Sequence, residues 1–290
     1  MRALRPDRAI TVRPYERKDL SAARDLTFYN FNVHAHLDWQ TVDDYLLTNP
    51  PRLWVAHKYG KLVGIVSFSD TLGGISWIRV AAADDTERPN VIFRHMWEQA
   101  CPQLKADGVQ QVAVLVMRDL IDRFMKDVGF QYVEDIVTLR RYGRKLPPPP
   151  PEHPEMDIRH MEAEHYAAVT GVDHTAFSPP WQLTQDEIRL GARMSAYSSI
   201  AVVNEKAIGY QIATTHGMNG HLARLGVVPQ IQGHGVGGVI LRDMIEWFMR
   251  RNVLTISVNT QESNIRSQKL YEKYGFHRNG YDLPVWIVDL

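Results

Sequence analysis

The chain has 290 residues, of which 44% are hydrophobic and 23% are charged, a composition typical of folded proteins and unlike that of disordered ones. Lys plus Arg number 33 and Asp plus Glu also number 33, so the formal net charge is zero. Broad electrostatic binding to nucleic acid or to an acidic membrane needs clustered excess Lys and Arg. We therefore expect neither nucleic acid nor membrane among the partners.

The single cysteine, Cys101, excludes an internal disulfide framework and a Cys-rich zinc site. His34 and His36, followed by Asp38, resemble a metal cluster only faintly, and we interpret them as part of a polar loop. We expect no metal. No apolar run reaches the roughly 18 residues of a membrane span, and the charged start lacks the apolar segment of a signal peptide. The expected location is the cytoplasm, and the expected state is a monomer or homodimer.

Five consecutive prolines, at positions 147–151, divide the chain almost in half. Consecutive prolines adopt polyproline II and cannot continue a helix or a central strand. We therefore predict a first domain over 1–144, a semi-rigid proline-rich linker over 145–155 and a second domain over 156–290.

The two halves resemble each other. Residues 54–64 and 200–209 both have the pattern of a strand, a tight polar turn and a second strand, which predicts a hairpin in each half. Gly129-Phe130 and Gly275-Phe276 both follow a helical pattern, with glycine at the position after the helix. The hairpins are 145 residues apart and the Gly-Phe pairs 146 residues apart. This near-constant spacing indicates an internal duplication.

In the second half, apolar spacing predicts strands and helices in alternation. The expected elements are a strand over 221–228, a helix over 236–251, a strand over 254–259, a helix over 265–274 and a final strand over 281–288. Ser263 or Asn264 would cap the second of these helices. The order is typical of an α/β fold (α+β with a mixed sheet), in which a central sheet is flanked by helices.

The loop over 227–238 joins a strand to a helix and contains four glycines, Gly233, Gly235, Gly237 and Gly238. Glycines permit a tight turn, and the free amides at a helix N-terminus favour an anion such as pyrophosphate. A Walker A loop is excluded because Gly-Lys-Ser/Thr is absent. A Rossmann fingerprint is disfavoured because the spacing is Gly-x-Gly-x-Gly and the loop lies late in its half.

A Gln-x-x-Gly-x-Gly-like loop, followed by Asn264, by Tyr271 seven residues later, and by Gly275-Phe276, resembles the acetyl-CoA motifs of the GNAT superfamily of N-acyltransferases. The resemblance is strong over 156–290 and weak over 10–143. It implies two tandem GNAT-like domains, each with a mixed central sheet flanked by helices, and acetyl-CoA as the acyl donor.

The resemblance also implies cofactor-binding roles. The backbone of the strand would pair with the pantetheine arm, the glycine-loop amides would hold the pyrophosphate, and an Asn would contact the pantetheine or acetyl region. The residues concerned are Leu225, Gly226, Val227, Gln232, Gly233, His234, Gly235, Val236, Gly237, Gly238 and Asn264. The alternatives are a plain strand–helix turn for the glycines and a helix cap alone for the Asn.

Two catalytic residues follow from the resemblance. Tyr271 would protonate the departing CoA thiolate, unless it is only an aromatic packed on a helix face. One branch of the family keeps a Glu base where this chain has Asn259, which cannot act as a base. Another branch keeps its base at the position of His221, and a neutral imidazole suits that work. A packed or surface role for His221 and a base role for Glu262 are the alternatives.

The acceptor site would lie near residues 177–181 and the final strand. Phe177 and Trp181 would bind an apolar part of the acceptor, or merely connect two helices by packing. Asp282 would anchor a cationic amine, or serve a turn. The acceptor itself is expected to be a small-molecule or peptide amine.

The first half lacks the binding machinery. After residues 78–80, which resemble 225–227, the sequence contains no glycine and three acids, Asp84, Asp85 and Glu87. Met125 stands where Tyr271 stands, and Arg118 where Asn264 stands. We therefore expect a degenerate first domain and one site in the second, which transfers acetyl from acetyl-CoA to a primary amine by direct attack. The alternative is a catalytically silent acyl-CoA-binding or scaffold protein.

Overall fold

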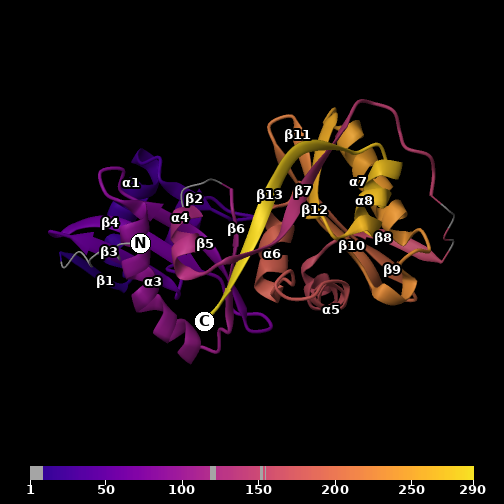
Figure 1. Cartoon of the computed structure of the whole chain (residues 1–290). Coiled ribbons are helices and arrows are strands. Elements are labelled where there is room, and N and C mark those ends of the chain that lie inside the picture. Colours follow the sequence, from indigo (N-terminus) through magenta and orange to yellow (C-terminus); the bar gives the residue numbers. More distant parts are fainter. Residues whose placement is uncertain (1–8, 118–121, 151–152, 154) are drawn as a thin grey trace. The chain divides into compact units, whose positions relative to one another are not determined.

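The computed structural model describes residues 9–117, 122–150, 153 and 155–290. The chain forms two compact units (Figure 1). Unit 1 comprises residues Met1–Glu134 and Leu283–Leu290, and unit 2 comprises Asp135–Asp282. Each is a mixed sheet flanked by helices, as the sequence predicts.

The sheet of unit 1 has the strand order β1-β3-β4-β5-β6-β13, and β2 pairs with β5. Its strands are β1 (Ile10–Pro14), β2 (Val33–Ala35), β3 (Leu53–Lys58), β4 (Lys61–Phe68), β5 (Ile75–Ala83), β6 (Gln111–Leu115) and the end of β13 (His277–Asp289). Its helices are α1 (Leu20–Tyr29), α2 (Val42–Leu47), α3 (Pro89–Ala106) and α4 (Asp122–Val128).

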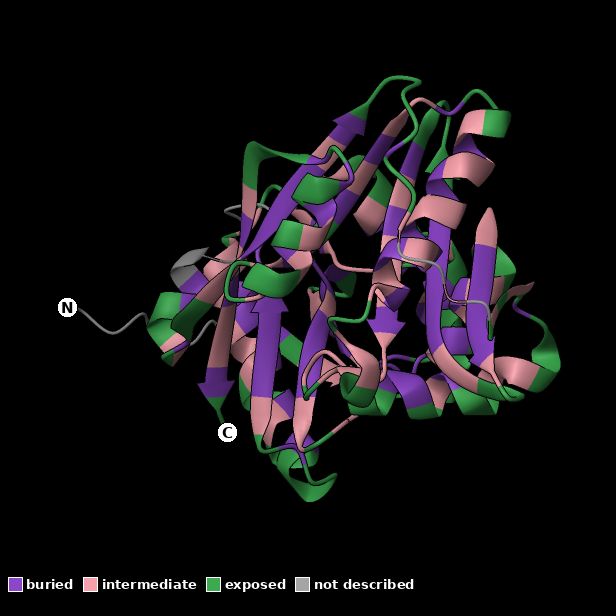
Figure 2. Cartoon of the chain, turned by 90° about the vertical axis from the view of Figure 1, so that its right-hand side faces the viewer, coloured by how far each residue is buried: buried purple, intermediate pink, exposed green. Residues whose placement is uncertain are grey.

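Side chains alternate between the two faces of the sheet along each strand, and in unit 1 both faces carry apolar residues. Helices therefore cover both faces. In β3, Leu53 and Val55 pack in a cluster with α1 and α2, whereas Trp54 and Ala56 pack in a cluster with α3 and α4. Buried residues follow the strands, and exposed ones gather in loops and on outer helix faces (Figure 2).

The sheet of unit 2 has the strand order β7-β12-β11-β10-β9-β8. Its strands are β7 (Gln131–Tyr142), β8 (Met156–His160), β9 (Tyr197–Val203), β10 (Lys206–His216), β11 (Asn219–Val227) and β12 (Thr255–Gln261). Its helices are α5 (Tyr166–Ala176), α6 (Gln185–Met194), α7 (Val236–Arg250) and α8 (Ile265–Lys273). The expected strand, helix, strand and helix between 221 and 274 are confirmed to within two residues at each end.

Each sheet is completed by a strand from the other half of the chain. β7 pairs antiparallel with β12, from Ile136↔Gln261 to Tyr142↔Thr255. The end of β13 pairs antiparallel with β6, from Val285↔Leu115 to Asp289↔Gln111. The linker predicted over 145–155 falls within the sequence range of unit 2, and its residues 151, 152 and 154 lie outside the described residues.

The expected polar loop at His34 is wrong. His34 lies in strand β2, is 1% exposed and sits opposite Ala81 of β5. Burial lowers the pKa of His34 to about 4, so its imidazole is neutral at neutral pH. Within the described residues, no group of three or more His, Cys, Asp and Glu side chains is arranged to hold a metal ion.

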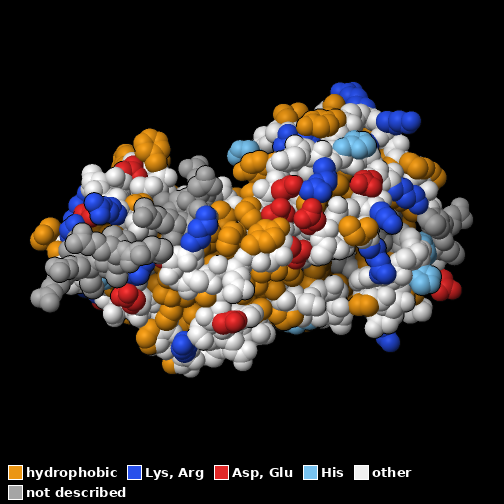
Figure 3. Space-filling model, in the orientation of Figure 1, with side chains coloured by type: hydrophobic (Ala, Val, Ile, Leu, Met, Phe, Trp, Pro, Cys, Tyr) orange, Lys and Arg blue, Asp and Glu red, His pale blue; other side chains and the backbone are white. Residues whose placement is uncertain are grey.

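None of the described helices is both long enough and apolar enough to cross a membrane. On the face of the molecule drawn in Figure 3, basic and acidic side chains lie interspersed with hydrophobic ones.

Candidate functional site

The centre of unit 2 contains a place where two parallel strands part. β11 pairs with β12 from Asn219↔Thr255 to Leu222↔Val258, and in the described residues the register ends there. Its other edge stays paired with β10 as far as Val227↔Gly209. The backbone of β11 after Leu222 therefore has polar groups on the β12 side that an extended ligand can pair with, as a strand would.

A β-bulge at Ala223 adds one residue to β11 relative to β10 at this point. Leu222 and Leu225 pack in the cluster formed by α7 and α8. Arg224 and Gly226 instead contact residues of α5 and of the loop after it. The bulge thus places an arginine on the α5 face, close to the parting of the strands.

The glycine loop turns into α7 through two left-handed residues. Gly233 has φ +89° and Gly235 has φ +93°, conformations that side chains other than glycine adopt at a cost. Gly235 is the N-cap of α7, so no side chain caps the first amides, and the first turn carries no acidic residue. The amides of Val236 and Gly237 have no acceptor within the helix. This end of α7 is suited to an anion.

Gly237 and Gly238 have a different role, which the sequence did not indicate. A Cβ at Gly238 would collide with the hydroxyl of Tyr274, and one at Gly237 would lie 3.3 Å from Leu270. Both partners belong to or directly follow α8. These two glycines therefore permit α7 and α8 to pack closely, in addition to any amide contact with a ligand.

Gln232 braces the loop. Its Nε2 donates to the carbonyl of Val227 at 2.8 Å, and its Oε1 accepts from Arg266 Nη1 at 2.5 Å. The side chain thus ties the loop to the end of β11 and to the first turn of α8. His234, between the two left-handed glycines, is exposed.

Asn264 is the N-cap of α8, and its Oδ1 accepts from the amide of Ser267 at 3.1 Å. The predicted cap is therefore confirmed, and the contact with the pantetheine or acetyl region stays a prediction. Ser263 is not the cap.

Tyr271 lies in α8, is 5% exposed and packs in the same cluster as Leu222. Burial raises the pKa of Tyr271, and the positive charge of Arg224 opposes that rise. The phenol therefore keeps its proton at neutral pH, as a general acid must.

His221 lies on the last paired stretch of β11, opposite Ser257 of β12. Its Nδ1 is 2.9 Å from Ser257 Oγ, and that hydroxyl donates to the carbonyl of Gly220 at 3.4 Å. In the tautomer that donates from Nδ1 to this hydroxyl, the lone pair of the imidazole is on Nε2. A base role for Nε2 is compatible with this arrangement.

A buried ion pair, missed by sequence reasoning, joins α5 to β11. Asp173 is fully buried, and its Oδ2 accepts from Arg224 Nη2 at 2.6 Å and Nε at 2.9 Å. The Tyr210 hydroxyl donates to the same oxygen, and the amide of Leu183 donates to Oδ1 at 2.8 Å. The one available signal was an arginine among the apolar residues 222–227, since its partner is 51 residues away in the sequence.

The predicted acceptor residues Phe177 and Trp181 both contact this pair. The Arg224 guanidinium lies 3.6 Å from the centre of the Phe177 ring, and its Nη2 donates to the carbonyl of Trp181. Asp282 is engaged elsewhere: its Oδ2 accepts from Arg278 Nη2 at 2.7 Å, and its Oδ1 is buried without a hydrogen-bond partner among the described residues. The structure therefore brings Phe177 and Trp181 together around Arg224.

Unit 1 repeats the frame of this site. β5 and β6 pair in parallel from Ile75↔Gln111 to Trp77↔Ala113, a register 144 residues before that of β11 and β12. Ala83 lies opposite Gly64 as Val227 lies opposite Gly209. The counterpart of residues 225–227 is therefore 81–83, and the correspondence with 78–80 expected from the sequence is wrong. A β-bulge lies at the same place in both pairs of strands, at Arg79 of β5 and at Ala223 of β11, so the offset of 144 residues holds on both sides of it.

The unit 1 loop holds a carboxylate of its own. Asp84 accepts from the amide and the hydroxyl of Thr86, at 2.9 and 2.6 Å, and from Lys61 Nζ at 2.6 Å. These contacts lower the pKa of Asp84 to about 2, against the opposing effect of burial. Arg118, the expected counterpart of Asn264, lies outside the described residues.

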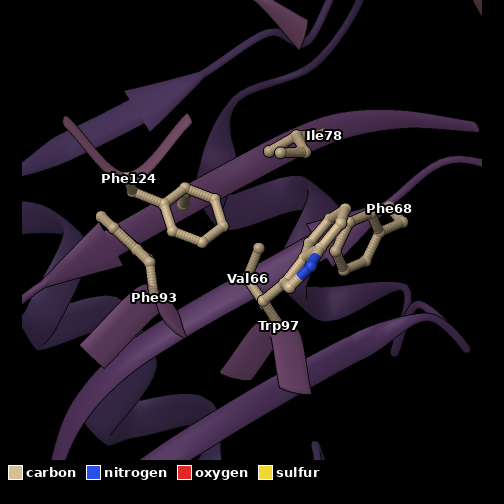
Figure 4. Close-up of a pocket in the computed structure, with 7 residues that line it drawn as sticks. Val66, Phe68, Ile78, Phe93, Trp97 and Phe124 are labelled. Atoms are coloured by element: carbon tan, nitrogen blue, oxygen red, sulfur yellow. The ribbon is translucent and has the colours of Figure 1, made fainter. Parts of the chain in front are cut away.

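Aromatic side chains fill the space beside the unit 1 strands. An apolar cavity of about 10 Å³ remains among them, comparable to a single water molecule (Figure 4). It is lined by Val66, Phe68, Ile78, Ala81, Phe93, Trp97 and Phe124. Helix α4 of unit 1 corresponds to α8 of unit 2. Its Met125 is fully buried and stands where unit 2 has Tyr271.

Comparisons with known proteins agree with this geometry. Residues 162–276 match the sequence profile of the Acetyltransferase (GNAT) family. The chain is 27% identical over 133 residues to the [Ribosomal protein bS18]-alanine N-acetyltransferase of Haemophilus influenzae, covering 44% of this chain and 88% of the relative. It is 25% identical over 138 residues to an uncharacterized N-acetyltransferase of Methanocaldococcus jannaschii, covering 46% and 85%.

The likeness extends over both units in the solved structures. A tandem GNAT protein from the clavulanic acid biosynthesis pathway superposes with a TM-score of 0.67 and 15% identity, covering 97% of this chain and 98% of that one. At this identity the match concerns the fold, and it includes the tandem arrangement.

Proposed function

Because the chain belongs to the acetyltransferase (GNAT) family and has its tandem architecture, we propose that unit 2 transfers acetyl from acetyl-CoA to a primary amine. The observation that carries the proposal is the coincidence of three features: the end of the β11–β12 register at Leu222↔Val258, the uncapped N-terminus of α7, and the buried phenol of Tyr271.

The donor would be held by backbone more than by side chains. The free edge of Leu225–Val227 would pair with the pantetheine arm, and the amides from Gly233 to Gly238 would receive the pyrophosphate. Gln232 and His234 belong to this loop, one as a brace and the other at its exposed rim. A side chain at Gly226 would meet Tyr210 at 2.6 Å, so the strand must be bare there.

The reaction we propose is direct attack. The amine nitrogen, once unprotonated, attacks the thioester carbonyl carbon to form a C–N bond, and the C–S bond breaks. Tyr271 donates its proton to the departing thiolate, and His221, directly or through water, takes the proton that the amine loses. Asn259, exposed on β12, offers no base at the position where a Glu serves in other members of the family.

The absence of a Glu at that position favours a second candidate, a silent acyl-CoA-binding or scaffold protein. One experiment on the full chain separates the two. Acetyl-CoA is titrated by calorimetry, and CoA thiol release is then followed with a panel of primary amines. Binding with amine-dependent release supports the transferase, binding without release supports the silent protein, and no binding contradicts both.

A further inference from the structure

The Arg224 guanidinium is held rigidly by its surroundings but is not fully used by them. Its Nε and both protons of Nη2 are directed to Asp173, Tyr210 and the carbonyl of Trp181. In the part of the chain that the structure describes, Nη1 has no hydrogen-bond partner. The side chain is 14% exposed, so this remaining amino group has access to solvent or to a ligand.

The two partners of the ion pair also differ in how many of their hydrogen-bonding groups are used. Asp173 is fully buried and accepts from four donors, namely two nitrogens of Arg224, the Tyr210 hydroxyl and the Leu183 amide. These four donors provide both oxygens of the buried carboxylate with hydrogen bonds from the protein. Arg224, by contrast, keeps two N–H donors on Nη1 directed away from its partner. An anion that approaches this edge meets a fixed donor pair with little reorganisation.

The Nη1 group of Arg224 lies close to the place where we propose that acetyl transfer occurs. Arg224 follows the bulge directly at the parting of β11 and β12, and its guanidinium carbon lies 3.6 Å from the centre of the Phe177 ring. Its charge is felt by the hydroxyl of Tyr271, which we propose to act on the leaving thiolate. The acceptor must bring its nitrogen to the same place, so a group attached near that nitrogen lies within reach of Nη1.

We propose that the acceptor is an amine that carries a carboxylate close to the reacting nitrogen, as an amino acid does, and that Arg224 Nη1 binds this carboxylate while Phe177 and Trp181 flank it. The inference rests on the proposed function and names its substrate class. A monoanion suits the site, because one free amino group, beside an already paired aspartate, provides too few donors for a doubly charged phosphate.

The test compares matched acceptors on the full-length protein. Each common amino acid and its carboxamide is offered with acetyl-CoA, and kcat/KM is obtained from CoA release. The two members of a pair differ in the charge and little in shape. For the best amino acid we expect the acid to be preferred over the carboxamide by about 10- to 100-fold, the usual effect of one hydrogen bond to a charged group.

Two variants locate the preference. Arg224→Gln combined with Asp173→Asn removes both charges, so that no lone buried charge remains. We expect the acid-to-carboxamide ratio to fall to about one in this variant, with acetyl-CoA binding retained. Arg251→Gln is the matched control, because Arg251 also stacks on an aromatic ring, at 3.7 Å from Trp247, but at the far end of α7. Its ratio should stay that of the wild type.

Several results would overturn the inference. Equal or better turnover of the carboxamides by the wild type does so without any variant, whether or not the double variant folds. A double variant that loses rate equally on acid and carboxamide assigns Arg224 to the acetyl group instead. Release of CoA only with amines that lack a carboxylate refutes the inference and leaves the transferase standing, whereas no release with any amine refutes both.

Discussion

The loops that lead into α3 and α7 occupy the same place in the two units and differ in charge and in the residue that caps the helix. In unit 2 the residues between β11 and α7 are 228–235, with glycine as the N-cap. In unit 1 the residues between β5 and α3 are 84–88, with Arg88 as the N-cap and Pro89 as the first helical residue. The amides of Asp84 and Val228 even make equivalent bonds, to the carbonyls of Val63 and Ile208.

The two loops differ in the source of negative charge: unit 1 carries its own, whereas we propose that a ligand brings it to the loop of unit 2. Unit 1 supplies the charge as the Asp84 carboxylate, which accepts from Thr86 and pairs with Lys61. Proline at the start of α3 also removes one helix N-terminal amide. Unit 2 presents bare amides and no acid. The comparison thus explains, from local chemistry, why we expect a single acetyl-CoA per chain.

The largest expected effect sharpens the contrast between Tyr271 and Met125. The backbone carbonyls of Tyr271 and Met125 accept from the amides of Phe276 and Phe130, five residues later in each case, at 3.0 Å. The two residues are therefore structural counterparts. Tyr271→Phe makes unit 2 resemble unit 1 in lacking a proton donor while keeping the ring. We expect turnover to fall by roughly 10²–10⁴-fold with acetyl-CoA affinity nearly unchanged.

The control for this prediction is Tyr274→Phe, which removes a phenol of similar burial three residues away. Steady-state kinetics under conditions where chemistry limits the rate provide the measurement. Equal turnover of Tyr271→Phe and the wild type would assign the proton to water or substrate.

The second prediction concerns His221, whose counterpart in the register of unit 1 is Trp77. His221→Gln retains a side chain that can bond Ser257 and removes the imidazole. If Nε2 receives the amine proton, kcat/KM falls by about 10- to 100-fold at neutral pH and recovers at high pH, where the free amine is abundant. A pH–rate profile compares the two proteins, and an acid limb that is identical in both would exclude His221 as the base.

The sequence predicted local features of unit 2 well and long-range ones poorly. The strand–loop–helix over 219–250 and the Asn264 cap follow from hydrophobic spacing and from glycine and asparagine at fixed positions, all of which act within a few residues. The bulge at Ala223 depends on the register with β10, and the Arg224–Asp173 pair depends on a helix 51 residues earlier. The bulge leaves no local signal, and the pair leaves only its arginine, among apolar residues, while the partner cannot be read from nearby sequence.

The same limit explains two other results. That β13 leaves unit 2 to pair with β6 is a choice between partners, and the continuous apolar run over 283–288 suits either sheet. The glycines at 237 and 238 look alike in sequence to those at 233 and 235, yet only the structure shows Tyr274 and Leu270 against them.

The third prediction tests whether Asp84 serves the fold of unit 1. Its folded-state pKa of about 2 lies below the ordinary 3.8, so the ionised carboxylate contributes about 2 kcal/mol to stability, present above pH 4 and lost as the pH falls towards 2. We expect Asp84→Asn to destabilise unit 1 by about that amount at pH 7 and to bind acetyl-CoA as the wild type does. Hydrogen exchange in β4 and β5, measured at several pH values, gives the result.

Asp70→Asn provides the control, because this carboxylate is 75% exposed and its contact with Arg52 is long, at 3.4 Å. Its effect should stay below about 0.5 kcal/mol. A second acetyl-CoA bound by Asp84→Asn would contradict the comparison, since it would mean that the carboxylate alone keeps the ligand out of unit 1.

The smallest expected effect comes from copying the unit 1 chemistry into unit 2. His234 is exposed and lies between Gly233 and Gly235 without a left-handed backbone, so a substitution there strains nothing. His234→Glu places a carboxylate at the rim of the loop, where it would repel a pyrophosphate through solvent. We expect acetyl-CoA binding to be about tenfold weaker at low salt, and the loss of affinity to be smaller at high salt, because exposed charges are screened over about 10 Å at 0.1 M ionic strength.

His234→Gln is the control that separates charge from size, and it should bind acetyl-CoA as the wild type does. Calorimetry at two salt concentrations decides the matter: if His234→Glu and His234→Gln bind equally at both, the pyrophosphate does not lie at this end of α7.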